Sequence, residues 1–454
     1  MALSTGPTSK LCEWVCSTRY EDLPAEVLKE TKTMLYDQVG CMIAVATLPS
    51  CQPVVDLVRK MGGHEQCSIV GHPVRTSLMN AALANGTIGH GGEVDSTSQQ
   101  GMGHVACHAV PATLSVGQYV GASGKEFMRA LAVGFEVAAR FQTVYRAHQG
   151  RGNFAQQVGG TMGDTVSAGL LLGLDADQMG HALGTAASGA CGLHGHHGDL
   201  HQNKTLNVGR AVSAGVLSAL LAQQGVQGPR DILTTYHGFC DTFMGLPESG
   251  HEVVEGLGEH YLISQILYKR YPVGLPLQTP IHAILQLMTK HELTPDDITD
   301  IEVWVLSSSM RTLTVFKHPC LHLETSLSLA AVYGEITFAH IHDPQYQEDP
   351  RFKAFRDRVR IFIKPRSEET HIGQRTGTGM NMDTTITLHT RARKELSEEL
   401  RYPLMDEEEI QQKFRALVGL RLDGQKVADL EMRLKAVETM ESMAPLARQL
   451  EVPY

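Results

Sequence analysis

An aspartate and a histidine stand close together on a stretch that is rich in glycine and serine. The segment GHGGEVDSTSQQGMGHVACHAVPATL, residues 89–114, places Asp95 and His104 on a predicted loop just before an apolar helix. A carboxylate next to an imidazole can hold or tune its proton near neutral pH, which suits general acid–base catalysis. Taken alone, a histidine on a loop is more often a surface or capping residue, so the pair is a hypothesis that needs support from other segments.

A dense group of histidines lies in the segment CGLHGHHGDLHQNKTLNVGRA, residues 191–211. The imidazoles belong to His194, His196, His197 and His201. Two of them have the i, i+4 spacing that suits zinc on a helix face, but glycines interrupt such a helix and no HExxH pattern occurs. A polar cleft wall and a solvated loop are the alternatives. Lys204, which precedes a helix of small residues, is better placed to bind a substrate carboxylate, and we assign His201 and Gln202 to the same binding surface.

Two further segments combine polar residues with proline or glycine. YKRYPVGLPLQTPIHAI, residues 268–284, puts Lys269 and Arg270 where a second domain is expected to begin, and ligand clefts commonly form between domains. A Lys-Arg pair before a proline is also an ordinary surface turn. GQRTGTGMNMD, residues 373–383, lacks the strand and helix that flank a GxGxxG dinucleotide loop, so we expect a loop or hairpin. Neither GxxxxGK[ST] nor GxSxG occurs in the sequence.

Helices are expected to position most of these side chains. Apolar residues recur at helical spacing over residues 24–46, and Ser123 and Glu126 form a capping box that begins another helix. Residues 160–225 are dominated by glycine, alanine, serine and leucine, which predicts helices that approach one another closely. Together these segments predict a large all-helical domain over residues 1–265.

The sequence pattern changes near residue 265, where strands are expected. IEVWVL, VRIFIKP and TTITLHT alternate apolar and polar residues as half-buried strands do, and SLSLAAVYG between them is helical in pattern. A further helix is expected around residues 281–291, which completes a smaller α+β domain over residues 266–399. RARKELSEELR is expected to be a solvated linker; Asp406 then caps a helix, and residues 400–454 join the first domain. The predicted fold class is mainly α.

The charge balance and the cysteines restrict the classes of protein. With 39 Lys and Arg against 49 Asp and Glu, the net charge of −10 works against nonspecific attraction to nucleic acid or anionic membranes. Nine cysteines are scattered without metal-type pairing, which indicates free thiols in a reducing compartment. Neither a signal peptide nor a run of about 18 apolar residues is found, so we expect a cytoplasmic protein without a membrane span.

Five segments stand in a fixed order along nearly the whole chain. They are LANGTIGHGGEVDSTS, HVACHAVPATLSVGQ, GFEVAAR, HQNKTLNVGRAVSAGVLSALLAQQG and YKRYP. They resemble, in turn, the stretches N-G-x-x-x-H-x-x-D-x-D-D, HPSxxxxPAxLAxAE, GxEVxxR, TKPxHxGxAAxxGxxAAxLAxxG and (F/Y)KxYP of the MmgE/PrpD family. That family includes 2-methylcitrate dehydratase, cis-aconitate decarboxylase and iminodisuccinate epimerase. The order and spacing of the segments make the resemblance more specific than any one motif.

The resemblance implies a large helical domain with a smaller α+β lid, a homodimer, a small polycarboxylate substrate, and neither a metal nor a cofactor. Asp95 falls on the first acid of the family's Asp-Asp pair, where Ser96 takes the second place, and His104 falls on the histidine of HPS. Lys204 matches the lysine of TKP, and Lys269 matches the lysine before YP. Two ammonium groups can bind carboxylates and stabilise an enediolate-like charge, and His104, oriented by Asp95, can move a proton. These four residues are the predicted catalytic residues.

Three places depart from the decarboxylase-like pattern of the family. Asn153 and Phe154 stand where that pattern has a histidine, Gly274 takes the place of a second histidine, and a tyrosine is replaced around Ser328 or Leu329. These losses argue against cis-aconitate decarboxylation in that form. The histidine-rich segment before Lys204 is a conjectural source of a substitute proton donor.

The combined pattern predicts a lyase. Its expected reaction is removal of water, or less favourably of carbon dioxide, from a citrate-like acid through a carbanion stabilised by Lys204 and Lys269. An isomerase or epimerase shares the deprotonation step and needs no leaving-group acid. A noncatalytic polycarboxylate-binding homologue and a metal-dependent hydrolase are the alternatives from other classes.

Overall fold

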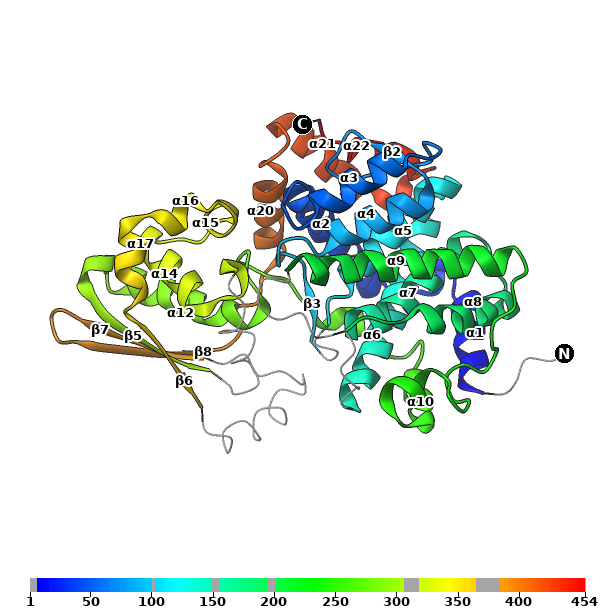
Figure 1. Cartoon of the computed structure of the whole chain (residues 1–454), viewed down its shortest axis with the longest axis horizontal. Helices are drawn as coiled ribbons and strands as arrows, with labels where there is room; N and C mark the ends of the chain where they lie inside the picture. Colours follow the sequence, from blue (N-terminus) through cyan, green and yellow to red (C-terminus); the bar gives the residue numbers. More distant parts are fainter. Residues whose placement is uncertain are drawn as a thin grey trace.

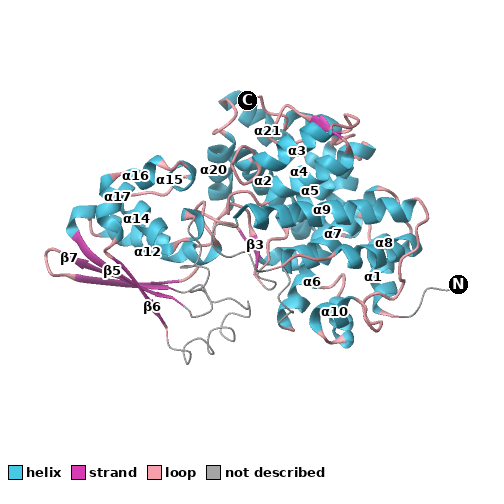
Figure 2. Ribbon diagram, viewed as in Figure 1, coloured by secondary structure: helices cyan, strands magenta, loops and turns pink. Residues whose placement is uncertain are grey.

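The protein is built mainly from helices, which confirms the predicted fold class. The computed structural model describes residues 6–99, 103–148, 155–193, 201–305, 318–364 and 384–453. The earlier helices are α1 (Pro7–Ser17), α2 (Ala25–Val45), α3 (Gln52–Met61), α4 (Leu78–Gly89), α5 (Ala106–Val120), α6 (Gly124–Ala147), α7 (Ala155–Leu171), α8 (Ala176–Gly189), α9 (His201–Gln223), α10 (Phe239–Met244) and α11 (Gly250–Val253). The later helices are α12 (Leu275–Lys290), α14 (Leu323–Tyr333), α15 (Phe338–His342), α16 (Gln345–Glu348), α17 (Pro350–Arg356), α20 (Glu407–Val418), α21 (Gly424–Lys435) and α22 (Ala444–Gln449). Figures 1 and 2 show their arrangement.

Small residues bring the central helices into close contact, as the sequence predicted. A Cβ added to Gly86 of α4 would lie 2.9 Å from the Cα of Gly209 of α9. A Cβ added to Gly163 of α7 would lie 2.4 Å from the carbonyl oxygen of Gly134 of α6. Real Cβ atoms do not approach other atoms this closely, so larger residues at these positions would push the helices apart.

Among the described residues, one helix, α9, is long and apolar enough to be compared with a membrane span. By length and composition its segment Gln202–Gln223, with a mean hydropathy of 1.3, is able to cross a membrane. However, 61% of this apolar segment is buried inside the protein, where α9 packs between α4, α7 and α8. This burial is typical of the central helix of a helical core, and it explains why the sequence of α9 is so rich in small apolar residues.

One four-stranded sheet lies in the later part of the chain. Its strands are β5 (Ile298–Val305), β6 (Val359–Ile363), β7 (Thr384–Thr390) and β8 (Glu395–Leu400), in the order β6-β5-β7-β8. β5 is parallel to β6 and antiparallel to β7, and β7 is antiparallel to β8. Helices α12 and α14 pack on the sheet, and Ile301 and Ile386 of its buried face join their hydrophobic core (Figure 2). The three strands that alternation predicted are confirmed.

A two-stranded ladder of β1 (Cys67–Ser68) and β2 (Arg75–Thr76) lies in the earlier part of the chain.

Two stretches differ from the prediction. The charged segment 391–401 is not a solvated linker, because it forms a turn and the edge strand β8. Leu396 and Leu400 of this strand pack against the core, while Ser397 and Glu399 are exposed. Charged residues on an edge strand discourage pairing with other chains, so a high charge content does not exclude a strand. Helix α12 begins at Leu275, earlier than predicted, because Pro276 is tolerated in the first turn of a helix.

Helices α20 and α21 pack against α2, and α22 packs against α5 (Figure 1). The ring of Phe414 in α20 stacks on Tyr36 of α2 with centroids 3.9 Å apart. Gly40 makes this approach possible, since a Cβ there would lie 2.8 Å from Phe414 Cδ2. Next to this contact, Lys413 Nζ lies 2.7 Å from Asp37 Oδ1 in a buried ion pair. Helix α20 is therefore joined to α2 by both apolar and charged contacts.

Candidate active site

The loop between α4 and α5 carries most of the acid–base groups. Near its start, Ser50 Oγ donates to the Gly91 carbonyl at 2.8 Å. Further along, β3 (Thr97–Ser98) pairs antiparallel with β4 (Ile266–Leu267). This pairing brings the loop beside Lys269, although the two segments lie far apart in the sequence.

Asp95 and His104 form a hydrogen-bonded pair. His104 Nδ1 lies 2.7 Å from Asp95 Oδ2, and the Nδ1 of a second imidazole, His90, lies 3.0 Å from the same oxygen. The centroids of the two imidazole rings are 4.4 Å apart. Because an ionised carboxylate only accepts hydrogen bonds, both Nδ1 atoms donate to Asp95, and both Nε2 atoms keep the lone pair of a base.

Burial and hydrogen bonding set the protonation of these three groups. Burial lowers the pKa of His90 to about 4, although the Asp95 carboxylate opposes the shift. Burial also lowers the pKa of His104, again against the effect of Asp95. Burial acts to raise the pKa of Asp95, but the two imidazoles and Lys269 outweigh it and hold that pKa well below its usual range. At neutral pH the cluster therefore contains an ionised carboxylate beside two neutral imidazoles.

Glu93 joins the two predicted lysines, and the sequence analysis missed it. Its Oε1 pairs with Lys204, and its Oε2 lies 3.1 Å from Lys269 Nζ. Lys269 also donates to the backbone carbonyl of Glu93 at 3.0 Å. Burial acts to raise the pKa of Glu93, but Lys204 and Lys269 hold it well below its usual range. The ionised carboxylate thus offsets one of the two positive charges and fixes the position of both ammonium groups.

The backbone of Glu93 adopts an unusual conformation. Its φ angle of 59° lies in the left-handed region, which residues with a side chain rarely occupy. Besides the Lys269 contact, Lys413 Nζ donates to the carbonyl of the next residue, Val94, at 2.8 Å. Backbone conformations of this kind persist where surrounding groups fix them, and they cluster at functional sites.

The four predicted catalytic residues lie in one buried cluster. His90 connects the Asp95–His104 pair to the group of Glu93 and the two lysines. Its Nδ1 faces Asp95, and its Nε2 lies 3.9 Å from Glu93 Oε1. Exposure separates the two lysines, since the side chain of Lys204 is 10% exposed and that of Lys269 is 0% exposed. The side chain of His104 is likewise 10% exposed. A molecule from solvent therefore reaches Lys204 and His104 more easily than the other members.

The remaining predicted binding residues are not placed in this cluster. Gln202 is exposed, and its side-chain amide donates to the Pro49 carbonyl at 3.1 Å rather than to a group of the cluster. The side chain of His201 lies outside the described residues, as do residues 149–154 and 194–200. These ranges include Asn153, Phe154 and most of the histidine-rich segment, so the hypothesis of a substitute proton donor stays a prediction. The Gly-rich segment 373–383 also lies outside the described residues.

The other positions that depart from the family pattern are packed in the later part of the chain. A Cβ added to Gly274 would lie 2.7 Å from Leu321 Cδ2, so no imidazole fits there without a rearrangement. Leu329 is fully buried in the core that α14 shares with the sheet. Ser328 Oγ donates to the Glu324 carbonyl of its own helix at 2.6 Å. These positions supply neither an imidazole nor a phenol to the cluster.

Two histidines from the later part approach the loop that carries Glu93. A Cβ added to Gly92 would lie 3.2 Å from His342 Nε2. The rings of His318 and His342 lie 5.5 Å apart, and His318 Nδ1 lies 3.0 Å from Cys320 Sγ. Burial, together with the neighbouring His318, lowers the pKa of His342 to about 3. The sequence analysis missed both residues because no local pattern links them to a loop so distant in the chain.

Comparison with known proteins gives matches over both parts of the chain. Residues 9–251 match the MmgE/PrpD N-terminal domain, and residues 271–436 match the MmgE/PrpD C-terminal domain. Cis-aconitate decarboxylase from Aspergillus terreus is 24% identical over 99% of this chain and 96% of its own length. A cis-aconitate decarboxylase-like protein from Aspergillus oryzae is 28% identical over 58% of this chain and 57% of its own length. Cis-aconitate decarboxylase from Homo sapiens is 24% identical over 95% of this chain and 92% of its own length. Because the two domain matches together span most of its length, the chain belongs to the MmgE/PrpD family.

Proposed function

We propose that the protein is a lyase that removes water from a small citrate-like polycarboxylic acid by acid–base catalysis, without a metal. The observation that supports this most is a single buried cluster in which the Asp95–His104 pair lies next to Lys204. Removal of a proton beside a carboxylate requires such a base together with a group that stabilises negative charge. Loss of carbon dioxide is the second candidate, because relatives that match almost the whole chain are named cis-aconitate decarboxylases.

In the proposed reaction His104 acts as the base. Its Nε2 lone pair takes the proton from the carbon next to a substrate carboxylate, and the electron pair left on that carbon spreads into the carboxylate. Lys204 donates to this carboxylate and stabilises the enediolate-like charge. The electron pair then returns to form a carbon–carbon double bond. The hydroxyl of the neighbouring carbon leaves as water with the proton that His104 holds.

Lys269 has a different part in this proposal. Its ammonium group is fully buried and donates to both the side chain and the backbone of Glu93. We therefore place Lys204 on the substrate and make Lys269 a positioning residue for Glu93. The sequence analysis expected both lysines to bind substrate, whereas this proposal gives that role to Lys204 alone.

We also propose that residues 266–399 form a lid domain over the cluster. The hydrophobic core that α12, α14 and the sheet share consists of buried residues from Val273 to Leu388 only, which supports a separate folding unit. The approach of His318 and His342 to the Glu93 loop supports a position of this unit next to the cluster.

The reaction type is tested by incubating the purified protein in D₂O with citrate, methylcitrate, aconitate and iminodisuccinate. NMR is expected to show new alkene signals with citrate or methylcitrate, because deprotonation is followed by loss of water. Release of carbon dioxide from aconitate would identify the decarboxylase instead. Deuterium incorporation with inverted configuration would identify an epimerase. No turnover and no deuterium exchange with any of the four acids would contradict the proposal.

The pH dependence of kcat/KM follows from the protonation of His104. Since the proposed base is the neutral imidazole and burial lowers its pKa below 6.5, the rate is expected to stay constant from neutral to mildly alkaline pH. It is expected to fall as the pH decreases through a value below 6.5, because the imidazole then takes a proton. The apparent pKa of this fall in rate is a property of Asp95, His90 and His104 together, because their protonation states are coupled. A rate that increases as the pH falls below 6.5 would refute the role of His104 as a base.

A further inference from the structure

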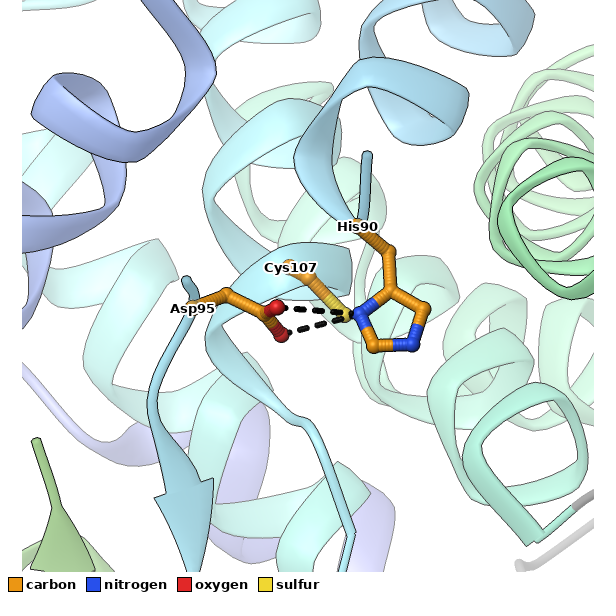
Figure 3. Close-up of side chains that lie close together, drawn as sticks. All are labelled: His90, Asp95 and Cys107. Atoms are coloured by element: carbon orange, nitrogen blue, oxygen red, sulfur yellow. Dashed lines mark hydrogen bonds and ion pairs between the residues drawn. The ribbon is translucent and has the colours of Figure 1, made fainter. Parts of the chain in front are cut away.

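We propose that His90, Asp95 and Cys107 form a binding site for a soft divalent cation such as Zn²⁺. An imidazole nitrogen, a carboxylate oxygen and the thiol sulfur of these residues all lie within 4.8 Å of one another. Figure 3 shows the three side chains pointing toward one another from the end of α4, the loop before β3 and the first turn of α5. The site goes beyond the proposed lyase activity, which uses no metal.

The donor set and the spacing suit zinc. Zinc takes nitrogen, oxygen and sulfur ligands, and three protein ligands leave a fourth position for water or another molecule. Ligand distances of about 2.0–2.3 Å place the donor atoms of a tetrahedral site roughly 3–4 Å apart. His90 Nδ1 and Asp95 Oδ2, at 3.0 Å, already meet this spacing. The thiol of Cys107, which donates to the His104 carbonyl at 3.3 Å, needs a small movement of its side chain to complete the site.

Metal binding at this place rearranges two protons. His90 has to present an unprotonated Nδ1, so its proton moves to Nε2, which faces Glu93 Oε1 at 3.9 Å. Cys107 binds as a thiolate and releases its proton to solvent. All three ligands are at most 1% exposed, so the cation would be held out of contact with bulk water.

A bound cation would compete with proton transfer by His104. Asp95, whose Oδ2 orients His104 at 2.7 Å, is one of the three ligands of the site. Metal and imidazole then share one carboxylate, and the cation withdraws the negative charge that orients the base. Zinc is therefore expected to inhibit the enzyme. This consequence rests on the proposed function, whereas the binding site itself does not.

Titration of the whole protein with Co²⁺ tests the site without any substrate. A thiolate bound to Co²⁺ gives a near-ultraviolet charge-transfer band, which is expected to saturate at one Co²⁺ per chain. Cys107→Ser is expected to lose this band. The matched control is Cys67→Ser, because Cys67 is also fully buried and also donates to a backbone carbonyl, that of Ser115, at 3.3 Å. The control variant is expected to keep the band, and Cys107→Ala repeats the test if the serine variant is unstable.

Two results would overturn the metal site. They are the absence of a saturating band in the wild-type protein and a band that persists in Cys107→Ser. Zinc inhibition is measured separately, as a fraction of the metal-free rate of each variant. The half-inhibitory zinc concentration is expected to rise at least about tenfold in Cys107→Ser, since even changes outside the ligand shell weaken metal binding by 10–100-fold. Cobalt binding at Cys107 without zinc inhibition would support the site and contradict the catalytic role of the Asp95–His104 pair.

Discussion

Replacing His104 with glutamine is expected to lower kcat by about 10²–10⁴-fold, the range that general acid–base catalysis contributes. Glutamine donates a hydrogen bond to Asp95 but carries no basic nitrogen, so the variant removes the proton transfer and keeps the contact at the carboxylate. The melting temperature is expected to stay within a few degrees of the wild type. The measurement is steady-state turnover of the accepted substrate, together with thermal unfolding followed by circular dichroism.

His181→Gln serves as the matched control for this variant. His181 is similarly buried, and its Nδ1 lies 2.9 Å from the Gly228 carbonyl, in a part of α8 that is not in the cluster. The control is expected to retain nearly the full kcat. Equal turnover in His104→Gln and the wild type would remove His104 from the mechanism. A large fall in melting temperature only in His104→Gln would assign it a structural role instead.

Replacing Lys413 with methionine is expected to destabilise the protein by about 3–5 kcal/mol, the cost of leaving one partner of a buried ion pair alone. Lys413 pairs with Asp37 at 2.7 Å, and their side chains are 9% and 1% exposed. Burial acts to raise the pKa of Asp37, and the ammonium group of Lys413 acts to lower it. Without Lys413, the buried carboxylate loses the positive charge that stabilises its ionised form. The variant also removes the bond to the Val94 carbonyl in the loop between α4 and α5. Urea unfolding, followed by circular dichroism, measures the loss.

Lys435→Met is the control for this stability prediction. Lys435 pairs with Glu431 at the same 2.7 Å, but its side chain is 47% exposed, and Glu431 keeps a second partner in Arg415. Removal of an exposed pair is expected to cost less than about 1 kcal/mol. Replacing both buried partners, in Asp37→Leu/Lys413→Met, is expected to recover part of the stability, because no buried charge remains. If Lys413→Met were no less stable than Lys435→Met, the buried pair would not support α20.

Local patterns predicted most of the elements because the information for them lies in neighbouring residues. Ser123 and Asp406 cap α6 and α20 through bonds to residues three positions ahead. The alternation in TTITLHT predicted β7 with the bounds that the structure shows. The edge strand β8 was missed, because only its pairing with β7 distinguishes it from a charged linker.

The sequence by itself determined the mainly helical fold and the candidates Asp95, His104, Lys204 and Lys269, since caps, periodicity and motifs are properties of short segments. Only the tertiary structure decided that Glu93 lies between the two lysines and that His90 shares Asp95 with His104. The contacts of Glu93 with the lysines depend on the β3–β4 pairing and on helix packing, which bring together groups more than a hundred residues apart. His90, Asp95 and His104 lie close together in the sequence, but only the folded loop shows that both imidazoles face one carboxylate. A buried charge is stable only beside such partners, so its role becomes visible once the chain is folded.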